Sequence, residues 1–317
     1  MQIYTPESFK ENNNKPCVTV LGNFDGVHKG HAELIRKAKA VADENGYLLC
    51  VYTFSEHPSN FKGGVCGLLT TNDEKAQLIE KLGADILYTD CFDAVKDMPC
   101  EDFCRDILVS RLGTKIAVCG KNYRFGRCGM GDASTLKSEM ESLGAKAFVE
   151  ELKTENGSEV SSTAIRTLIA EGKTIEAKRL LGRAYSFGAK VVHGRHLATQ
   201  LGAPTINQTF PKEKIVPKKG VYAAYLSVDG KGYMGVANVG TKPTVTSDEK
   251  DPPVICETHI INYKGDLYGK YIKTEFHVRL RDEKKFSSLT ELSEAIKKNV
   301  EETLLYFGSK GDVTKDE

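Results

Sequence analysis

Short apolar runs alternate with longer segments of helical periodicity over the first 181 residues of the chain. The spacing predicts helices that each end in glycine, a residue common just past a helix C-terminus. Such alternation predicts an α/β fold, a parallel sheet with helices on both faces. The strand candidates are residues 17–22, 47–54, 85–90, 115–120 and 145–152, and the helix candidates are residues 31–46, 73–83, 101–113 and 133–144.

The pattern changes after Gly182, where closely spaced β-rich runs follow without a helix long enough to cross between parallel strands. This spacing predicts an antiparallel barrel or sandwich, closed by an amphipathic helix near residues 289–304. We expect an α/β domain over residues 1–182, a β-barrel domain over residues 183–310 and a polar tail over residues 311–317. The β-rich runs are residues 185–194, 220–230, 232–240, 254–263 and 271–280.

Length and charge limit the class of protein. A chain of 317 residues can form two domains, and a formal net charge of +1 provides no field for extended binding to nucleic acid or a membrane surface. The N-terminus lacks the pattern of a signal peptide, and no apolar run reaches the roughly 18 residues of a spanning helix. We expect a cytoplasmic monomer or weak homo-oligomer that acts on small molecules, without nucleic-acid or membrane partners.

The nine cysteines favour reduced thiols over a metal site. No C-x-x-C occurs, and the closest pair, Cys100 and Cys104, lacks the second ligand pair that a structural zinc ion needs. Buried or half-buried thiols in a reducing compartment are therefore the expected state.

A phosphate site is one interpretation of the turn that follows the first long strand. That strand ends at Leu21 and a helix begins near Gly30, so the turn lies at the carboxyl end of the sheet, where α/β folds bind ligands. The helix start offers free N–H groups that suit phosphate, and His28 and His31 can point the same way from it. The alternative is a helix entry with one capping and one surface histidine.

The flanking residues favour the phosphate site. The segment G-N-F-D-G-V-H-x-G-H resembles the H-x-G-H signature of the nucleotidyltransferase superfamily, and its full form is similar to that of bacterial FMN adenylyltransferases. The resemblance implies a Rossmann-like domain that binds ATP. The residues it assigns to ATP in this segment are Gly22, Asn23, Phe24, Asp25, Gly26, His28, Gly30 and His31.

A second segment, V-S-S-T-A-I-R, resembles the other ATP signature of this family. There, hydroxyls matching Ser161, Ser162 and Thr163 and an arginine matching Arg166 hold the triphosphate, a task that suits the guanidinium fork. Many relatives have a further arginine where this chain has Ala164. Helix capping beside a surface arginine is the alternative.

Two loops resemble the flavin side of the same family. T-F-S-E-H-P-S-N-F carries Phe54, His57 and Pro58, and an aromatic side chain there could support a flavin ring. The glycine-rich residues 120–132 match a later loop, to which Asn122 and Phe125 belong. Long loops in compact domains are commonly functional, which favours binding over a bare surface loop.

The second half resembles riboflavin kinase. The resemblance implies that Gly202, Pro204, Thr205 and Asn207 contact nucleotide or flavin. Thr205 and Asn207 also contact Mg²⁺ in this interpretation, because a hard cation bridging ATP phosphates takes oxygen ligands. Glu257 matches the base that accepts the ribityl hydroxyl proton, although alternation alone predicts that it faces solvent. The matching segments, in the order of that family, are L-G-A-P-T-I-N-Q-T-F, K-K-G-V-Y-A-A-Y, G-V-A-N-V-G-T-K-P-T-V and I-C-E-T-H-I-I-N-Y.

Several positions depart from the riboflavin kinase pattern. Ala198 and Thr199 replace a glycine–arginine pair, and Ala203 replaces an aromatic residue. Asn262 stands where aspartate is frequent. Because of the first three departures, some phosphate or flavin contacts would come from other residues, for example Arg195 or His196.

Together the motifs cover about residues 15–307 and resemble the bacterial bifunctional riboflavin kinase and FAD synthetase. The resemblance implies that ATP with Mg²⁺ phosphorylates riboflavin to FMN in the barrel. A second ATP then adenylylates FMN to FAD in the α/β domain, where His28, His31 and Arg166 neutralise charge on the leaving pyrophosphate. Two alternatives are an adenylyltransferase whose barrel only binds flavin or regulates, and a flavin-sensing protein without activity.

Overall fold

The structure is a computed structural model that divides the chain into two compact units, Met1–Ala164 and Ile165–Glu317. Each unit is described by itself. The described residues are 1–9, 15–56, 67–151, 153–155, 157–192, 205–241 and 254–308.

The first unit is built on a six-stranded, wholly parallel sheet with the strand order β1-β4-β3-β2-β5-β6. The predicted α/β class is therefore confirmed. The edge strand β1 was not expected, because a three-residue run carries almost no periodic signal. The strands are β1 (Gln2–Tyr4), β2 (Cys17–Leu21), β3 (Leu48–Phe54), β4 (Ile86–Asp90), β5 (Thr114–Gly120) and β6 (Lys146–Glu150).

The strand order reverses between β2 and β5. From β2 the chain adds β3 and β4 on one side, then crosses back to place β5 and β6 on the other. Connections therefore leave the carboxyl ends of β2 and β5 in opposite directions, which opens the crevice where open α/β sheets bind ligands.

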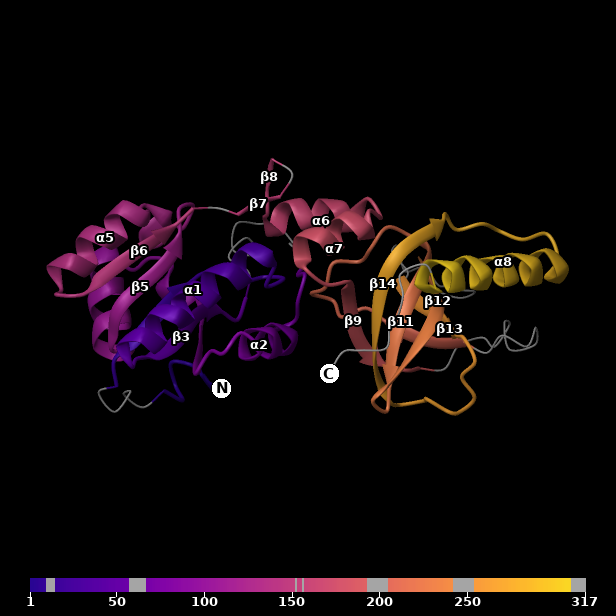
Figure 1. Ribbon diagram of the computed structural model, residues 1–317, viewed down its shortest axis with the longest axis horizontal. Coiled ribbons are helices and arrows are strands. Elements are labelled where there is room, and N and C mark those ends of the chain that lie inside the picture. The colour runs from indigo at the N-terminus through magenta and orange to yellow at the C-terminus, as the bar shows by residue number, and fades with distance from the viewer. Residues whose placement is uncertain are drawn as a thin grey trace. The chain divides into compact units, whose positions relative to one another are not determined.

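Helices cover both faces of this sheet (Figure 1). All five side chains of β2 are buried, and they alternate between two apolar clusters. Val18 and Val20 pack with α1 and α2, whereas Cys17 and Leu21 pack with η2 and α5. The helices are α1 (Lys29–Asn45), α2 (Asn72–Glu80), α3 (Phe92–Val95), α4 (Cys100–Asp102), the π-type helix η2 (Phe103–Arg111), the short η3 (Arg127–Gly129) and α5 (Ala133–Ser142).

A small hairpin of β7 (Thr154–Glu155) and β8 (Ser158–Glu159) leads to α6 (Ser162–Ala170) and α7 (Thr174–Leu181). The contacts group α7 with the second unit, and the Thr174 hydroxyl donates to the carbonyl oxygen of His277 at 3.0 Å. The sequence-based boundary counted these helices with the first domain, so the functional boundary within residues 165–182 stays a prediction.

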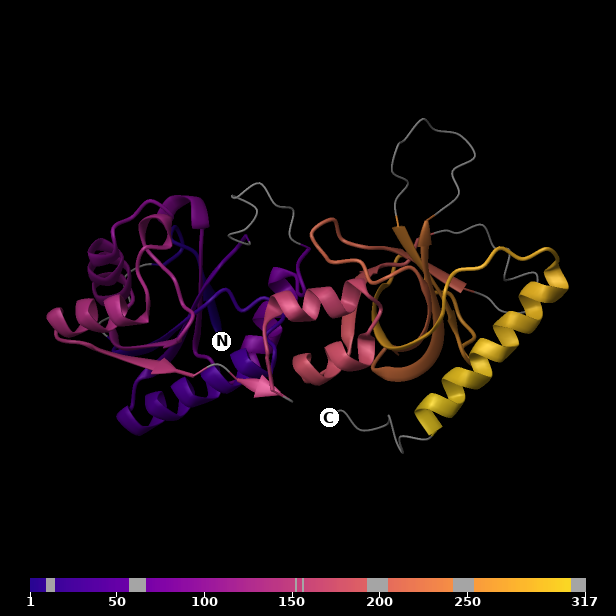
Figure 2. The same cartoon turned by 90° about the horizontal axis from the view of Figure 1, so that it is seen from above.

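The second unit contains a six-stranded sheet, wholly antiparallel, with the order β10-β13-β12-β11-β14-β9. Figure 2 shows its strands curving into a barrel with α8 alongside, against β11 and β12, as the sequence predicts. β10 escaped the sequence analysis because it is short and polar. The elements are β9 (Tyr185–Lys190), β10 (Thr205–Thr209), β11 (Gly220–Val228), β12 (Lys231–Thr241), β13 (Val254–Ile260), β14 (Tyr271–Arg281) and α8 (Leu289–Gly308).

The two ends of this curled sheet meet at one bridge pair, Val192 and Asn207. The buried side chain of Gln208 joins the same ends, because its Nε2 donates to Ala189 O at 3.1 Å and to Ile272 O at 2.7 Å. Its Oε1 accepts from the Thr274 hydroxyl at 2.7 Å. Among the described residues, this pair and the buried amide of Gln208 both join the two ends of the sheet.

The described cysteines are free thiols. Burial raises the pKa of Cys104 to about 12, so this thiol stays protonated and unreactive. Within the described segments, no helix is long and apolar enough to cross a membrane.

Candidate active sites

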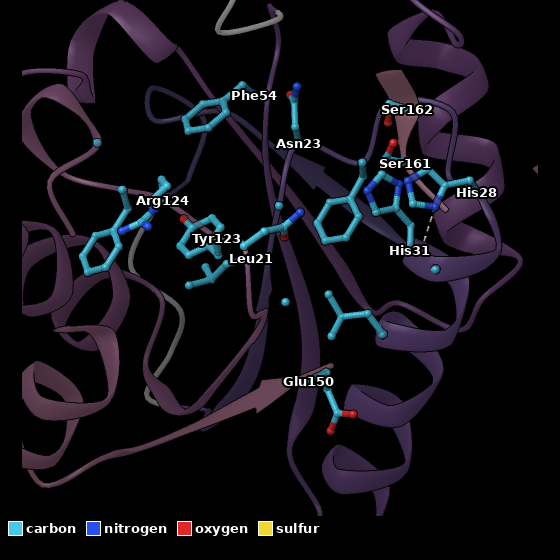
Figure 3. A pocket seen from close by; sticks show the side chains of 18 of the residues that line it. Leu21, Asn23, His28, His31, Phe54, Tyr123, Arg124, Glu150, Ser161 and Ser162 are labelled. Atoms are coloured by element: carbon cyan, nitrogen blue, oxygen red, sulfur yellow. Dashed lines mark hydrogen bonds between the residues drawn. The ribbon is translucent and has the colours of Figure 1, made fainter. Parts of the chain in front are cut away.

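A cavity of about 720 Å³ lies at the carboxyl ends of β2, β3 and β5, where the strand order reverses. Its volume is in the upper part of the range of about 300–1,000 Å³ that is typical of small-molecule sites. Figure 3 shows two histidines and two serines on one side and Phe54, Tyr123 and Arg124 across from them. The cavity therefore has a helix-terminus side and an aromatic side.

His28 is the N-cap residue of α1. Its Nδ1 accepts the backbone N–H of His31 at 3.3 Å, and an accepting Nδ1 carries no proton, so this hydrogen bond assigns the proton to Nε2. The two imidazoles stack with ring centroids 3.6 Å apart. A Cβ at Gly30 would lie 3.2 Å from His28 Cε1, so the glycine of H-x-G-H leaves room for the folded-back ring.

The first turn of α1 contains no acidic residue, so its free N–H groups remain attractive to an anion. His31 adds a buried Nδ1 without a hydrogen-bond partner among the described residues. Burial, followed by electrostatic interactions with His28 and Lys75, lowers the pKa of His31 well below its ordinary value. His31 is therefore neutral near pH 7 and offers hydrogen bonding rather than charge to a ligand.

The turn before α1 is strained. Phe24 and Val27 have φ angles of 49° and 36°, in the left-handed region that side chains other than glycine rarely adopt. The Phe24 ring is buried and contacts His31 edge-on, with centroids 5.2 Å apart. A Cβ at Gly22 would lie 2.8 Å from Phe24 Cζ, so Gly22 accommodates this ring, which in turn supports His31.

Asp25 and Gly26, both predicted to bind ATP, hold the segment before α2 in place. The Asp25 carboxylate accepts the N–H groups of Leu69 and Thr70 at 3.0 and 3.1 Å, and the Gly26 N–H donates to Thr70 Oγ1 at 3.0 Å. Neither residue is among those that line the cavity. In this structure both fix the shape of the turn, and a direct ATP contact stays a prediction.

The second predicted ATP segment meets the first. Ser161 Oγ accepts the Ala164 N–H at 3.3 Å and so caps α6, while Ser162 Oγ donates to Asp25 O at 2.8 Å. These serines and Thr163 line the cavity. Arg166 is half-buried one turn into α6 and belongs to the second unit, and it is not a lining residue.

On the aromatic side, the predicted residues Phe54, Asn122 and Phe125 line the cavity. Sequence reasoning missed Tyr123 and Arg124, although the glycine-rich loop motif surrounds them. Burial raises the pKa of Tyr123, so its hydroxyl stays protonated. His57 and Pro58 lie outside the described residues.

A second cavity, of about 230 Å³, lies in the barrel unit beside α8. Glu257 lines it, and the Thr205 hydroxyl donates to Glu257 Oε1 at 2.7 Å. Asn207, Glu257 and Asn238 form one row across β10, β13 and β12. Cross-strand partners share a face of a sheet, so this row presents one carboxylate between two amides.

Three further lining residues escaped the sequence analysis: Asn238, His259 and Arg281. Arg281 Nε donates to Asn299 Oδ1 of α8 at 3.2 Å. Polar residues at alternate positions of β13 are the signal that could have marked His259, and Asn238 is a lone polar side chain within an apolar stretch of β12. Arg281, at the end of β14, has no such pattern around it.

Thr205 and Asn207 fit the predicted magnesium contacts in donor chemistry. They are two residues apart on β10, so they share a face, and both offer neutral oxygens of the kind a hard cation takes alongside phosphate and water. No cluster of three or more histidine, cysteine or acidic side chains suited to a metal occurs among the described residues. The substrate phosphates would have to supply the negative charge.

The remaining predicted kinase positions, Gly202 and Pro204, lie outside the described residues, as do the departures at Ala198, Thr199 and Ala203. Asn262 is exposed in the turn after β13 with a φ of 59°. Asparagine tolerates this left-handed conformation better than most residues, which accounts for its presence there.

The first cavity lies where the strand order reverses, and it has histidines at a helix N-terminus. The barrel has a separate site with a carboxylate. Together they define a two-site, nucleotide-using transferase. Residues 10–164 match the family model for FAD synthetase, and residues 181–307 match that for riboflavin kinase. The chain therefore belongs to the bifunctional riboflavin kinase/FMN adenylyltransferase family, and the resemblance seen in the motifs is confirmed.

Relatives of that name match nearly the whole chain. It is 34% identical to the one from Bacillus subtilis (strain 168), over 98% of each chain. It is 33% identical to that of Pseudomonas fluorescens, over 90% of this chain and 92% of the relative. A crystal structure titled macrolide-efflux protein from Streptococcus pneumoniae has a TM-score of 0.85 and 26% identity, over 96% of this chain and 99% of that one. The efflux role in that title is said of that protein alone.

Proposed function

We propose that this chain makes FAD from riboflavin in two ATP-dependent steps, one in each unit. The observation that carries the proposal is the presence of two chemically different cavities in one chain. One has a stacked histidine pair at a helix N-terminus, and the other has a carboxylate held by a threonine. The first suits a polyphosphate, and the second suits deprotonation of an alcohol.

In the barrel, Glu257 accepts the proton of the riboflavin 5′-hydroxyl as that oxygen attacks the γ-phosphorus of ATP. The bond from phosphorus to ADP breaks, giving FMN and ADP. Thr205 already occupies Glu257 Oε1, which fixes the carboxylate and leaves Oε2 for the proton. Thr205 and Asn207 hold Mg²⁺, which when bound offsets phosphate charge, and Gly202 and Pro204 complete the nucleotide and flavin contacts.

In the α/β unit, an FMN phosphate oxygen attacks the α-phosphorus of a second ATP, and pyrophosphate leaves. Catalysis is alignment plus stabilisation of developing charge, so no protein nucleophile is needed. His28 Nε2–H, the α1 N-terminus and Arg166 stabilise the phosphates. Gly22, Asn23, Phe24, Asp25, Gly26, Gly30, His31, Ser161, Ser162 and Thr163 shape the ATP site, and Phe54, His57, Pro58, Asn122 and Phe125 contact the flavin.

The partners in this proposal are ATP, riboflavin and FMN. The net charge of +1 supports action on small molecules, without nucleic acid or a membrane surface. We place the chain in the cytoplasm, as a monomer or weak homo-oligomer.

The test is to incubate the purified chain with ATP, Mg²⁺ and either riboflavin or FMN, and to separate the flavins by chromatography over time. FMN followed by FAD is expected from riboflavin, and FAD directly from FMN. Conversion of FMN alone would overturn the kinase assignment and favour a barrel that only binds flavin. Failure with both flavins would overturn both assignments.

A further inference from the structure

A buried lysine lies behind the cavity of the first unit. Lys75, near the start of α2, is 6% exposed, and its Nζ donates to Phe54 O at 2.8 Å and to Thr53 Oγ1 at 3.4 Å. It is not among the residues that line the cavity, so it does not touch a substrate there. Nothing in the proposed mechanism uses it.

Lys75 belongs to a network that joins the nucleotide turn to the end of β3. Thr53 Oγ1, which accepts from Lys75, donates to Asn23 O at 2.9 Å. One turn away, Asn72 Nδ2 donates to Ser55 O at 2.9 Å. The start of α2 therefore holds two neighbouring strand ends: that of β2, which leads to the histidines, and that of β3, which carries Phe54.

Holding the end of β3 through hydrogen bonds does not by itself explain why residue 75 carries a positive charge. Both of its hydrogen-bond acceptors are neutral oxygens, and burying an ammonium against neutral partners is costly. Burial lowers the pKa of Lys75 to about 8, although the nearby Asp25 carboxylate opposes this change. A neutral donor such as glutamine could anchor a carbonyl without that cost.

The positive charge acts on the catalytic pair. Burial lowers the pKa of His31 most, followed by His28 and then by Lys75. The groups that act on His31 are thus His28 at the helix cap and Lys75 on α2, and the Asp25 carboxylate, which acts on Lys75, already accepts backbone N–H groups. A buried cation at this depth favours an incoming polyphosphate and adds to the effect of burial that keeps His31 neutral.

We propose that Lys75 is a positioning residue for adenylyl transfer: it locks the nucleotide turn to the end of β3 and keeps a positive charge behind the His28–His31 pair. This inference rests on the proposed function of the cavity. Lys75 would thus take part in the reaction without contacting either substrate. Its ammonium group would link the turn that binds ATP to the end of β3, which carries Phe54.

The first test compares Lys75→Met, Lys75→Gln and Lys75→Arg in the full chain. Lys75→Met should lower kcat/KM for FAD formation from FMN by about tenfold to a hundredfold, as small losses of alignment do. Lys75→Gln keeps a donor without the charge and should remain impaired, whereas Lys75→Arg should recover part of the loss. Lys81→Met, which removes an exposed lysine from the end of the same helix, should behave like the wild type.

FMN formation from riboflavin in the same preparations uses the other unit, so it measures the amount of active chain in the assay, and dispersed NMR signals from the first unit show whether that unit is folded. Titration of His31 by NMR in histidine-labelled protein gives a readout that loss of an anchor alone would not move. Lys75→Gln should raise the pKa of His31 toward its ordinary value. If Lys75→Met fails to fold, the Gln and Arg variants decide the question.

Two results would overturn the inference: wild-type FAD formation in folded Lys75→Gln, or an unchanged His31 titration in that variant. The wild-type chain separates this from failure of the proposed function. Absence of FAD formation in the wild type would contradict the proposed function itself. Equal FAD formation in the wild type and in Lys75→Gln would contradict only the role of Lys75.

Discussion

The two units build their cavities in opposite ways. In the α/β unit the functional side chains come from turns and helix starts beyond the strand ends, such as His28 and Ser162. In the barrel they come from the strands themselves, where register aligns Asn207, Glu257 and Asn238. A site built from loops depends on hydrogen bonds between turns that are distant in sequence. A site built from strands depends on the register of strand pairing. The predictions below test whether the two sites are independent.

Glu257→Gln should have the largest effect. Gln keeps an oxygen that can accept from Thr205 but cannot take the riboflavin proton, so FMN formation should fall by about 10²- to 10⁴-fold. Steady-state assays with riboflavin and, separately, FMN should show the loss for riboflavin alone. Glu283→Gln, an exposed carboxylate at the same cavity, is the matched control and should keep FMN formation. Retained kinase activity in Glu257→Gln would remove Glu257 from the mechanism.

His28→Ala should lower FAD formation from FMN by about 10²- to 10³-fold, the usual cost of losing a donor to developing charge. FMN formation from riboflavin should be spared. The variant also removes the cap of α1, which costs about 1 kcal/mol of stability. His28→Asn keeps a capping acceptor and an amide donor without the imidazole, so recovery of FAD formation in that variant would mean that the imidazole itself is not required.

Gln208→Leu should destabilise the barrel while leaving the α/β unit intact. The change leaves two carbonyls and the Thr274 hydroxyl without their partner, at a cost of about 1–3 kcal/mol. Loss of kinase activity should then need less denaturant than in the wild type, with loss of adenylyltransferase activity unchanged. Gln77→Leu, an exposed position on α2, serves as control. A parallel shift of both activities would show that the units unfold together.

Local patterns predicted the strand–turn–helix that carries His28 and His31, because residues adjacent in sequence determine the strand, the turn and the helix start. The hydrogen bond from Ser162 to Asp25 spans 137 residues, and no periodicity reveals it. The same holds for Lys75, whose burial follows from the packing of α2 rather than from its own segment. Motif resemblance brought the two ATP segments together where spacing could not.

In the barrel, the existence of strands was predictable but their pairing was not. Asn238 and His259 lie in strands that were expected, yet only the register places them beside Glu257 and Thr205. β10 is five residues long and largely polar, so it is defined by its partner β13 rather than by its own sequence. The grouping of α7 with the barrel likewise depends on contacts distant in sequence, such as that of Thr174 with His277.

Asn207 is both a proposed magnesium contact and one half of the Val192–Asn207 pair that closes the barrel. The proposed metal site therefore lies where the two ends of the curled sheet meet. Opening of the Val192–Asn207 pair would displace Asn207, a proposed metal ligand, before a core strand moves. Warming should therefore abolish phosphorylation of riboflavin while most of the unit is still folded. Conversely, a bound metal–nucleotide complex would hold the two ends of the sheet together, and the barrel should be most stable against unfolding when this substrate is bound.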